Sequence, residues 1–371
     1  MFYRSFLISV CVISVLSTNL YADAGFRGLG DLDEQDPSGR AYDISADGLI
    51  VVGNSHTQTF DDWVAFRWTD DDNMVDLGYL TGHNVSRSTH ISGDGLTIIG
   101  DGYHYSVDDR DAQFIWTMAT GMELLDVGGE VAAISFNGSV LAGKMDHATA
   151  RNEAFRRSGG SNTGLGFLAT PDSNSQSAVS DMSSDGSVIV GISFTPDLFV
   201  GFRWTMAGGM VSLGDLANNA TAVSGTGDVI VGRIRGVNPY SVYIWTEATG
   251  VIALFDPEPD SYIDSRDIST DGKTVVGNMQ PEHPSGGSGG RRGWRWTKAS
   301  GRQTIKEWLT DASVDSTGWL FDSAVAVSSD GTVVTGTAIN PSGDREPYIA
   351  WVVDDVISGG PGFSFENLEP K

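Results

Sequence analysis

The chain has one cysteine and few positive charges among its 371 residues, and each scarcity excludes a class of protein. Asp and Glu number 48 against 23 Lys and Arg, which gives a formal net charge of −25. Nucleic acids and anionic membranes attract positively charged surfaces, so this balance argues against both as partners. The hydrophobic content of 40% is sufficient for a folded core and argues against intrinsic disorder.

Long apolar runs are also lacking, and the one notable run lies near the N-terminus at residues 6–16. Arg4 precedes it and Ala22-Asp23-Ala24 follows it, which is the pattern of a secretory signal peptide. The run is too short for a comfortable membrane span. We therefore expect residues 1–24 to be a signal peptide, cleaved after Ala24 or alternatively after Ala22, and the mature protein to be secreted or periplasmic.

The single cysteine, Cys11, lies inside this segment. The alternative interpretation is a lipid-anchor site at Ser9-Val10-Cys11, which is disfavoured because Val10 is not small and the preceding stretch is short. The mature chain then has no cysteine, so it offers neither a disulfide nor a thiol nucleophile.

One phrase, ISADGLIVVG at residues 44–53, recurs six more times along the chain. Its serine returns at a regular interval, as Ser45, Ser92, Ser135, Ser183, Ser224, Ser269 and Ser328. So does its second glycine, as Gly53, Gly100, Gly143, Gly191, Gly232, Gly277 and Gly336, with spacings of 47, 43, 48, 41, 45 and 59 residues. A repeat of this length indicates a propeller, a solenoid or a similar array.

Each repeat contains four short runs of alternating hydrophobicity, which predict four β-strands, A to D. The Asp-Gly that follows the serine in five of the seven repeats predicts a two-residue type I′ hairpin between A and B. Strand C has an aromatic-x-Trp pattern, as in Phe66-Arg67-Trp68, except that Arg157 replaces the tryptophan in the third repeat. Longer helices are not expected; residues 305–309 are compatible with one helical turn at most.

Seven such repeats predict an all-β fold, a seven-bladed β-propeller of four-stranded antiparallel blades. The last repeat ends after strand C near residue 353, and an unpaired strand-like run, Leu29-Gly30-Asp31-Leu32, precedes the first. We therefore expect the N-terminal strand to complete the last blade and close the ring, which hides two strand edges. A β-solenoid is the rival, but it favours shorter repeats. The expected organisation is one propeller at residues 25–353 and a flexible tail at 354–371.

The Ser-x-Asp-Gly, Val-Val-Gly, Ala-Phe-Arg-Trp-Thr and Leu-Gly-Asp-Leu phrases resemble the bacterial extracellular HAF-repeat family over about residues 26–353. Val64-Ala65-Phe66 and Glu153-Ala154-Phe155 match its Ala-Phe core, whereas the family's histidine is absent from every repeat. The resemblance implies secretion and a repeat architecture, and it transfers no catalytic residues.

Candidate functional residues lie in the B–C and D–A connections, which vary between repeats and share one face of a propeller. The second repeat is densest there, and its predicted binding residues are His83, Arg87, Tyr103, His104, Tyr105 and Arg110. Aromatic stacking and bidentate arginine suit a glycan or a protein ligand. The simpler interpretation is that loops are polar in any protein. The seven serines recur at the same turn, so we assign them to the hairpins and not to catalysis.

The leading function is a non-catalytic binding module, expected as a monomer with no nucleic-acid partner and no membrane span. The alternative is a secreted polysaccharide lyase or glycoside hydrolase in the propeller funnel, with His104, Tyr105 and Arg87 as base, acid and carboxylate partner. No cofactor is expected. Asp70-Asp71-Asp72 and the group Asp31, Asp33 and Asp36 offer oxygen ligands for weak Ca²⁺ binding, but solvated loop charges are the simpler interpretation.

Overall fold

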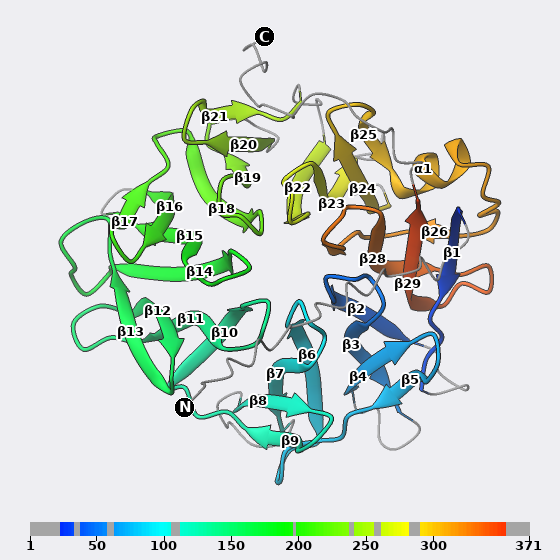
Figure 1. Ribbon diagram of the computed structural model, residues 1–371, viewed down its shortest axis with the longest axis horizontal. Coiled ribbons are helices and arrows are strands. Elements are labelled where there is room, and N and C mark those ends of the chain that lie inside the picture. Colours follow the sequence, from blue (N-terminus) through cyan, green and yellow to red (C-terminus); the bar gives the residue numbers. More distant parts are fainter. Residues whose placement is uncertain are drawn as a thin grey trace, which may run out of the picture.

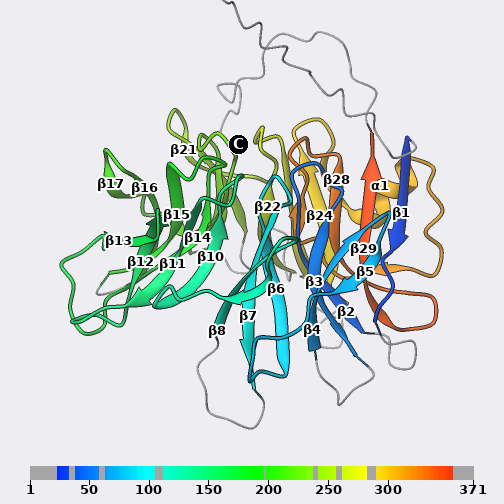
Figure 2. The same cartoon turned by 60° about the horizontal axis from the view of Figure 1, so that its bottom comes forward.

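The computed structural model describes residues 23–32, 38–57, 63–104, 112–195, 198–236, 241–255, 261–281 and 290–353. Within these residues nearly every regular element is an antiparallel β-strand, as the sequence predicts. The sheets stand around a common axis, and β2, β6, β10, β14, β18 and β22 lie on the inner side of their sheets (Figure 1). In a tilted view the strands of neighbouring sheets run side by side along this axis (Figure 2).

Seven repeat units follow one another along the chain, and we number them 1 to 7. Unit 1 consists of β2 (Gly39–Ile44), β3 (Val51–His56), β4 (Trp63–Thr69) and β5 (Asn73–Asp76). Unit 2 consists of β6 (Val85–Ile91), β7 (Thr97–Tyr103), β8 (Ala112–Thr117) and β9 (Gly121–Leu124). Unit 3 consists of β10 (Gly129–Ile134), β11 (Val140–Asp146), β12 (Asn152–Ser158) and β13 (Ser161–Gly166). Unit 4 consists of β14 (Gln176–Met182), β15 (Val188–Phe194), β16 (Phe199–Thr205) and β17 (Gly209–Ser212).

The remaining units keep the same strand order. Unit 5 consists of β18 (Ala217–Val223), β19 (Ile230–Ile234), β20 (Val242–Thr246) and β21 (Gly250–Ala253). Unit 6 consists of β22 (Ser261–Ile268), β23 (Thr274–Pro281), β24 (Arg292–Thr297) and β25 (Gly301–Thr304). Unit 7 consists of β26 (Leu320–Phe321), β27 (Ala326–Val327), β28 (Val333–Ile339), β29 (Arg345–Val352) and β1 (Ala24–Gly28).

The outer strand of unit 7 comes from the N-terminus, but it is not the run predicted from the sequence. The paired strand is β1, which runs antiparallel to β29 with Phe26 opposite Ala350, whereas residues 29–32 lie beyond its end. In units 1 and 4 the Leu-Gly pair likewise follows the outer strand. The leucines (Leu29, Leu77 and Leu213) are buried, and the next glycines (Gly30, Gly78 and Gly214) have positive φ. The phrase is therefore the turn after strand D.

The A–B turn also differs from its prediction. In unit 1 the hairpin is closed by the Ser45 amide donating to the Ile50 carbonyl, and only Gly48 has positive φ. A type I′ turn needs positive φ at both central residues, so the predicted two-residue turn is wrong. The longer loop is stabilised by Ser45, whose hydroxyl donates to Asp47 Oδ1 at 2.5 Å and accepts from the Ile50 amide at 3.0 Å. This supports a structural role for the recurring serines.

Backbone hydrogen bonds also run from each A–B turn to the next. The residue after the recurring serine, or in one case the residue after that, donates its amide to the neighbouring turn. The bonds are Ala46 to Gly93, Asp94 to Phe136, Phe136 to Ser184, Ser184 to Gly225, Gly225 to Thr270, Thr270 to Ser329, and Ser329 back to Ala46, with lengths of 2.8 to 3.1 Å. These bonds hold the inner ends of the sheets at fixed distances from one another.

The second glycine of each phrase recurs for a steric reason. A Cβ at Gly53 would meet the Arg40 carbonyl and the ring of Phe66, and the equivalent glycines in units 2 and 4 to 7 likewise face the aromatic residue of strand C. These aromatic residues are fully buried. The glycine therefore allows an aromatic ring to lie flat across strand B.

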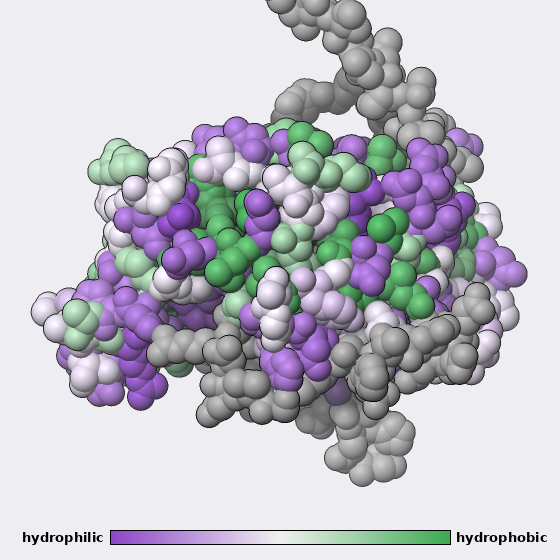
Figure 3. Space-filling model, turned by 90° about the horizontal axis from the view of Figure 1, so that it is seen from below, coloured by the Kyte–Doolittle hydropathy of each residue, from purple (hydrophilic) through white to green (hydrophobic). Residues whose placement is uncertain are grey.

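Apolar side chains pack between neighbouring units. Trp68 of β4 is 2% exposed and packs with Ala326 and Ile349 of unit 7. Trp204 and Trp296 are buried in the same way against the preceding units, whereas Trp116, Trp245 and Trp351 are only partly buried. Viewed edge-on, the outer surface shows apolar groups between hydrophilic ones (Figure 3).

The long spacing before the last glycine has a structural cause. The helix α1 (Ile305–Asp311) is inserted between β25 and β26, so the predicted single helical turn is too short. Thr304 and Glu307 form a capping box at its start, and Trp308 and Leu309 bury its inner face. The insertion accounts for the spacing of 59 residues between Gly277 and Gly336.

Candidate functional site

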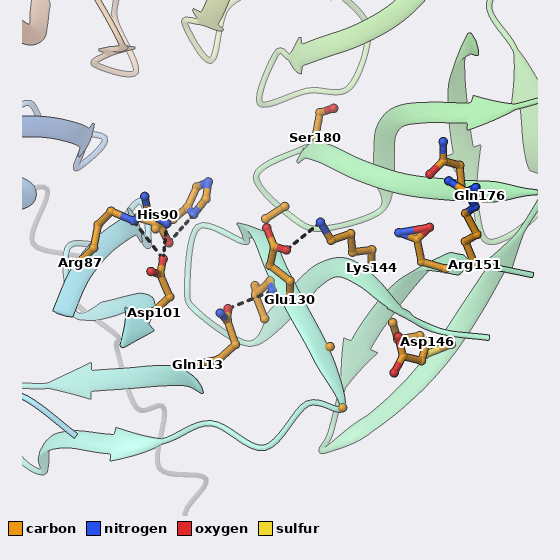
Figure 4. Close-up of a pocket in the computed structure, with 17 residues that line it drawn as sticks. Arg87, His90, Asp101, Gln113, Glu130, Lys144, Asp146, Arg151, Gln176 and Ser180 are labelled. Atoms are coloured by element: carbon orange, nitrogen blue, oxygen red, sulfur yellow. Dashed lines mark hydrogen bonds and ion pairs between the residues drawn. The ribbon is translucent and has the colours of Figure 1, made fainter. Parts of the chain in front are cut away.

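A cavity of about 850 Å³ opens among units 2, 3 and 4. Its lining residues come from the inner strands β6, β10 and β14, from β7 and β11, and from the starts of β8 and β12 (Figure 4). Its polar lining comprises Arg87, Thr89, His90, Asp101, Gln113, Glu130, Lys144, Asp146, Arg151, Asn152, Gln176 and Ser180. Because these residues lie on strands more than on loops, the frame of the cavity is defined by the sheets.

Unit 2 contributes an ion pair to the wall. Arg87 on β6 lies opposite Asp101 on β7 in the strand register. Its Nε and Nη2 atoms donate to Asp101 Oδ1 at 3.1 and 2.9 Å, and the carboxylate is almost completely buried. The guanidinium also lies 5.8 Å from the ring of Tyr42 in unit 1. Arg87 is thus held by groups from two units.

His90, three residues further along β6, lines the same cavity. Its Nδ1 lies 3.0 Å from Thr89 Oγ1. Burial, and after it the positive charge of Arg87, lowers the pKa of His90 to about 4. At neutral pH the imidazole is therefore uncharged and has one nitrogen able to accept a proton or a hydrogen bond.

Unit 3 contributes a second, more exposed ion pair. Lys144 Nζ on β11 lies 2.7 Å from Glu130 Oε2 on β10, and both side chains are about half exposed. Gln113 of unit 2 accepts a hydrogen bond from the Val131 amide at 3.1 Å. This bond joins the walls that the two units contribute.

A third positively charged residue, Arg151, lies where units 3 and 4 meet, and we call this boundary the seam. Asn152 pairs in parallel with Gln176, which joins the two units into one eight-stranded sheet. The Arg151 amide donates to the Ser175 carbonyl at 3.0 Å, so its backbone is fixed. Its side chain is exposed, and within the described residues its guanidinium has no hydrogen-bond or ion-pair partner.

A second cavity of about 400 Å³ adjoins this seam and shares Arg151 and Gln176 with the first. Phe194 and Phe199, at facing ends of β15 and β16, line it with ring centroids 4.9 Å apart. Phe199 is 40% exposed. Asp172 also lines this cavity and accepts hydrogen bonds from the amides of Asn174 and Ser175. These bonds, the Asn174 amide first, lower the pKa of Asp172.

The binding residues predicted from the sequence fall into three groups. Arg87 lines the large cavity. His83, Tyr103 and His104 lie at the same ends of β6 and β7 but are not among its lining residues. Tyr105 and Arg110 lie outside the described residues. The predicted set of His104, Tyr105 and Arg87 therefore remains a prediction.

Sequence reasoning missed several lining residues, among them His90, Glu130, Lys144, Arg151 and Gln176. His90 lies in strand β6 and so outside the B–C and D–A connections, in which the sequence predicts the functional residues. A usable signal existed, since residues just inside strands A and B of consecutive repeats must face one another across a propeller seam.

The described residues contain no group of three or more His, Cys, Asp or Glu side chains arranged to hold a metal ion. Two carboxylates of the predicted calcium cluster face arginines: Asp70 pairs with Arg27, and Asp72 with Arg67 at 3.3 Å. Asp33 and Asp36 lie outside the described residues. Among the helices that the structure describes, none is long and apolar enough to cross a membrane.

Comparison with known proteins identifies the fold. The sequence matches no model of a protein family and no curated protein. A prolyl endopeptidase structure is similar with a TM-score of 0.59 and 10% identity over 85% of this chain and 48% of that chain. The β-propeller domain of the trilobed protease from Pyrococcus furiosus is similar with a TM-score of 0.54 and 12% identity over 84% and 95%. The chain has a β-propeller fold.

A third similar structure is an oligogalacturonate lyase in complex with manganese, with a TM-score of 0.54 and 11% identity over 89% of this chain and 97% of that chain. This chain spans about half the length of the prolyl endopeptidase. At these identities the likeness concerns the fold.

Proposed function

We propose that this protein is a secreted or periplasmic binding module that takes a polar ligand, a glycan or a peptide, in the cavity among units 2, 3 and 4. The observation that carries this proposal is the polar lining of the 850 Å³ space, with two ion pairs and three amide side chains on rigid strands. Sites of this kind orient a ligand by a few fixed polar groups.

The finer architecture belongs to the same proposal. We infer a seven-bladed ring in which β1 completes the seventh blade. The antiparallel pairing of β1 with β29 and the hydrogen bonds that pass from turn to turn and return to Ala46 support it. The repeat phrases support membership of the HAF-repeat family, and the N-terminal segment supports secretion.

Binding of purified protein to a panel of oligosaccharides and peptides, followed by calorimetry, tests the function. Glu130→Ala and Lys144→Ala should weaken binding of any ligand found, because both side chains line the cavity. Exposed ion pairs contribute little to stability, so both variants should stay folded. The control is Lys273→Ala in the A–B turn of unit 6, which breaks a similar exposed pair, Lys273–Asp271 at 2.8 Å. Binding that is unaffected by changes in the cavity would refute the proposal.

A second candidate is a polysaccharide lyase or hydrolase using the same cavity. The observation in its favour is a neutral histidine, His90, lining the same cavity as the Arg87 guanidinium, because a lyase needs a base and a cation near the substrate carboxylate. The similar fold of an oligogalacturonate lyase adds a reason to test it. Release of unsaturated products or reducing ends that is lost in His90→Gln would establish catalysis.

A further inference from the structure

The large and the small cavity meet at Arg151 and Gln176, which line both of them. A ligand extending from one cavity into the other therefore crosses these two side chains. The parallel pairing of Asn152 with Gln176 holds the seam beneath them together. In the close-up Arg151 and Gln176 lie next to each other at one end of the large cavity (Figure 4).

The positively charged side chains along this path differ in whether they already have an acidic partner within the protein. Arg87 is paired with Asp101, and Lys144 with Glu130. Arg151 has no such partner among the described residues. A guanidinium binds a carboxylate through two parallel hydrogen bonds, so Arg151 is the position at which an acidic group of a ligand would be recognised.

Neighbouring acids limit how much negative charge a ligand can bring. Asp146 lines the first cavity and Asp172 the second, and hydrogen bonds from the Asn174 and Ser175 amides favour the charged form of Asp172. With a net charge of −25 on the whole chain, a densely anionic polymer would be repelled. The path therefore suits a short oligosaccharide with at most one carboxylate on each sugar, and not a run of phosphates or sulfates.

The remaining lining favours a carbohydrate over a peptide. Gln113, Asn152 and Gln176 present amides, which donate to and accept from hydroxyl groups. Phe199 offers a partly exposed ring on which the apolar face of a sugar can lie. Peptide anchors need apolar pockets, and the apolar residues of the large cavity are only Val131, Ala132 and Met145 besides glycines.

We propose that the two cavities form one extended groove for an oligosaccharide that contains a uronic acid, with its carboxylate at Arg151 and a neighbouring sugar ring on Phe199. This inference rests on the proposed function, because it assigns a ligand class to the same site. It assigns the order of contacts as well: hydroxyl groups along Gln113 and Asn152, the acid at the seam, and the stacked ring beyond it.

The test is calorimetric titration of the full chain with tetragalacturonate and tetramannuronate, and with cellotetraose as an uncharged tetramer. We expect at least one tetrauronide to bind more tightly than cellotetraose. Arg151→Gln should weaken that binding by roughly tenfold or more, while leaving any affinity for cellotetraose within about twofold. Lys273→Gln, which removes an exposed cation in an A–B turn, should change neither.

The stacking contact is tested separately. Phe199→Ala should weaken the tetrauronide by several-fold but leave a disaccharide unaffected if the disaccharide occupies only the large cavity. Leu96→Ala, at an exposed apolar side chain in the A–B turn of unit 2, is the matched control. Thermal melting of each variant confirms that it is folded.

The outcomes separate this inference from the proposed function. Equal binding of the tetrauronide by the wild type and by Arg151→Gln would overturn the inference. Tight binding of cellotetraose or of a peptide that depends on Glu130 and Lys144 but not on Arg151 would preserve the proposed function and overturn the uronide assignment. Absence of binding to every saccharide and peptide tested would overturn both.

Discussion

Arg157 occupies the position at which five other repeats have tryptophan. In unit 7 this position is Ala350, because Ala350 and not Trp351 lies opposite Val334. Its Nη1 donates to Asn162 Oδ1 at 2.9 Å, and Asn162 in turn donates to the Val127 carbonyl at 2.7 Å. The guanidinium thus has an amide partner and stays partly exposed, which avoids the cost of a buried unpaired charge. The apolar cluster between units 2 and 3 has five buried members, against twelve between units 5 and 6.

We therefore expect Arg157→Trp to raise the melting temperature, because an indole would extend the smaller cluster. The reverse change, Trp204→Arg, should cost about 3–5 kcal/mol, the range for loss of a large core side chain. Differential scanning calorimetry measures both. Arg157→Gln is the control, since it adds no apolar area and should not stabilise. A neutral or destabilising Arg157→Trp would show that the contact with Asn162 is worth more than the added packing.

The A–B turn is the smallest element that every unit repeats, and its serine serves two bonds at once. In unit 2 the Ser92 hydroxyl donates to Asp94 Oδ1 at 2.6 Å and accepts from the Thr97 amide at 3.0 Å. The side chain is completely buried. Removing it would leave the Thr97 amide without an acceptor in a place that water reaches poorly.

We expect Ser92→Ala to lower the free energy of unfolding by about 1–3 kcal/mol, the usual cost of leaving a buried donor unpaired. Urea denaturation followed by tryptophan fluorescence measures this change. Ser139→Ala, at an exposed serine in the equivalent turn of unit 3, should change stability by less than about 0.5 kcal/mol. Equal effects of the two variants would show that the turn serines are not structural.

The strand β1 is anchored to unit 7 by an aromatic side chain, Phe26. Phe26 lies edge-on to Trp319 and Phe321, with ring centroids 5.3 and 5.4 Å away. We expect Phe26→Ala to lower the free energy of unfolding by about 2 kcal/mol or more, because it removes an aromatic anchor from the strand that pairs with β29. Leu124→Ala, at an exposed side chain on the outer strand β9, is the control. An unchanged urea midpoint for Phe26→Ala would contradict a closing role for β1.

At the scale of the whole molecule, three partly buried aspartates join neighbouring units around the axis. Asp43, Asp181 and Asp267 accept the amides of Ile91, Val223 and Val327 from the next inner strand, at 2.8 to 2.9 Å. Burial raises the pKa of Asp43 to about 7 and that of Asp267 to about 6, and raises the pKa of Asp181 well above its usual range.

These shifts make stability depend on pH. Between the ordinary value of 3.8 and the raised pKa values, the unfolded chain has lost these protons while the folded chain still holds them. The stability contributed by the carboxyls of Asp43 and Asp267 is therefore complete below about pH 3.8 and is lost as the pH rises to about 7. The raised pKa of Asp181 acts in the same direction. His90, with its pKa lowered to about 4, acts in the opposite direction below pH 6.5 but is a single group.

We expect the melting temperature to fall as the pH is raised from about 4 to about 7. Asp181→Asn should flatten this dependence, whereas Asp126→Asn, at an exposed side chain, should not. Melting curves across this range, at constant ionic strength, are the measurement. A melting temperature that rises steadily over the same range would show that the carboxyls of Asp43, Asp181 and Asp267 are ionised in the folded protein.

The sequence by itself determined the features that depend on neighbours within one repeat. Seven equal phrases imply seven equal units, alternating hydrophobicity implies strands, and an Asp-Gly after a serine implies a turn, because these follow from local steric and hydrogen-bonding rules. The same rules did not reveal that β1 ends before Leu29, since Leu-Gly-Asp-Leu has strand-like residues and only burial of the leucine fixes the turn after it.

Only the tertiary structure decided what lies across a seam between units. His90 became a candidate because Glu130 of the next unit lines the same cavity, and Arg151 because Gln176 of unit 4 lies beside it. Sequence separation does not disclose such neighbours, since they depend on how far each sheet is rotated about the axis and on the ends of its strands. The repeats in the sequence predict the strands and the units. Which residues of different units line one cavity follows only from the way the units pack against one another.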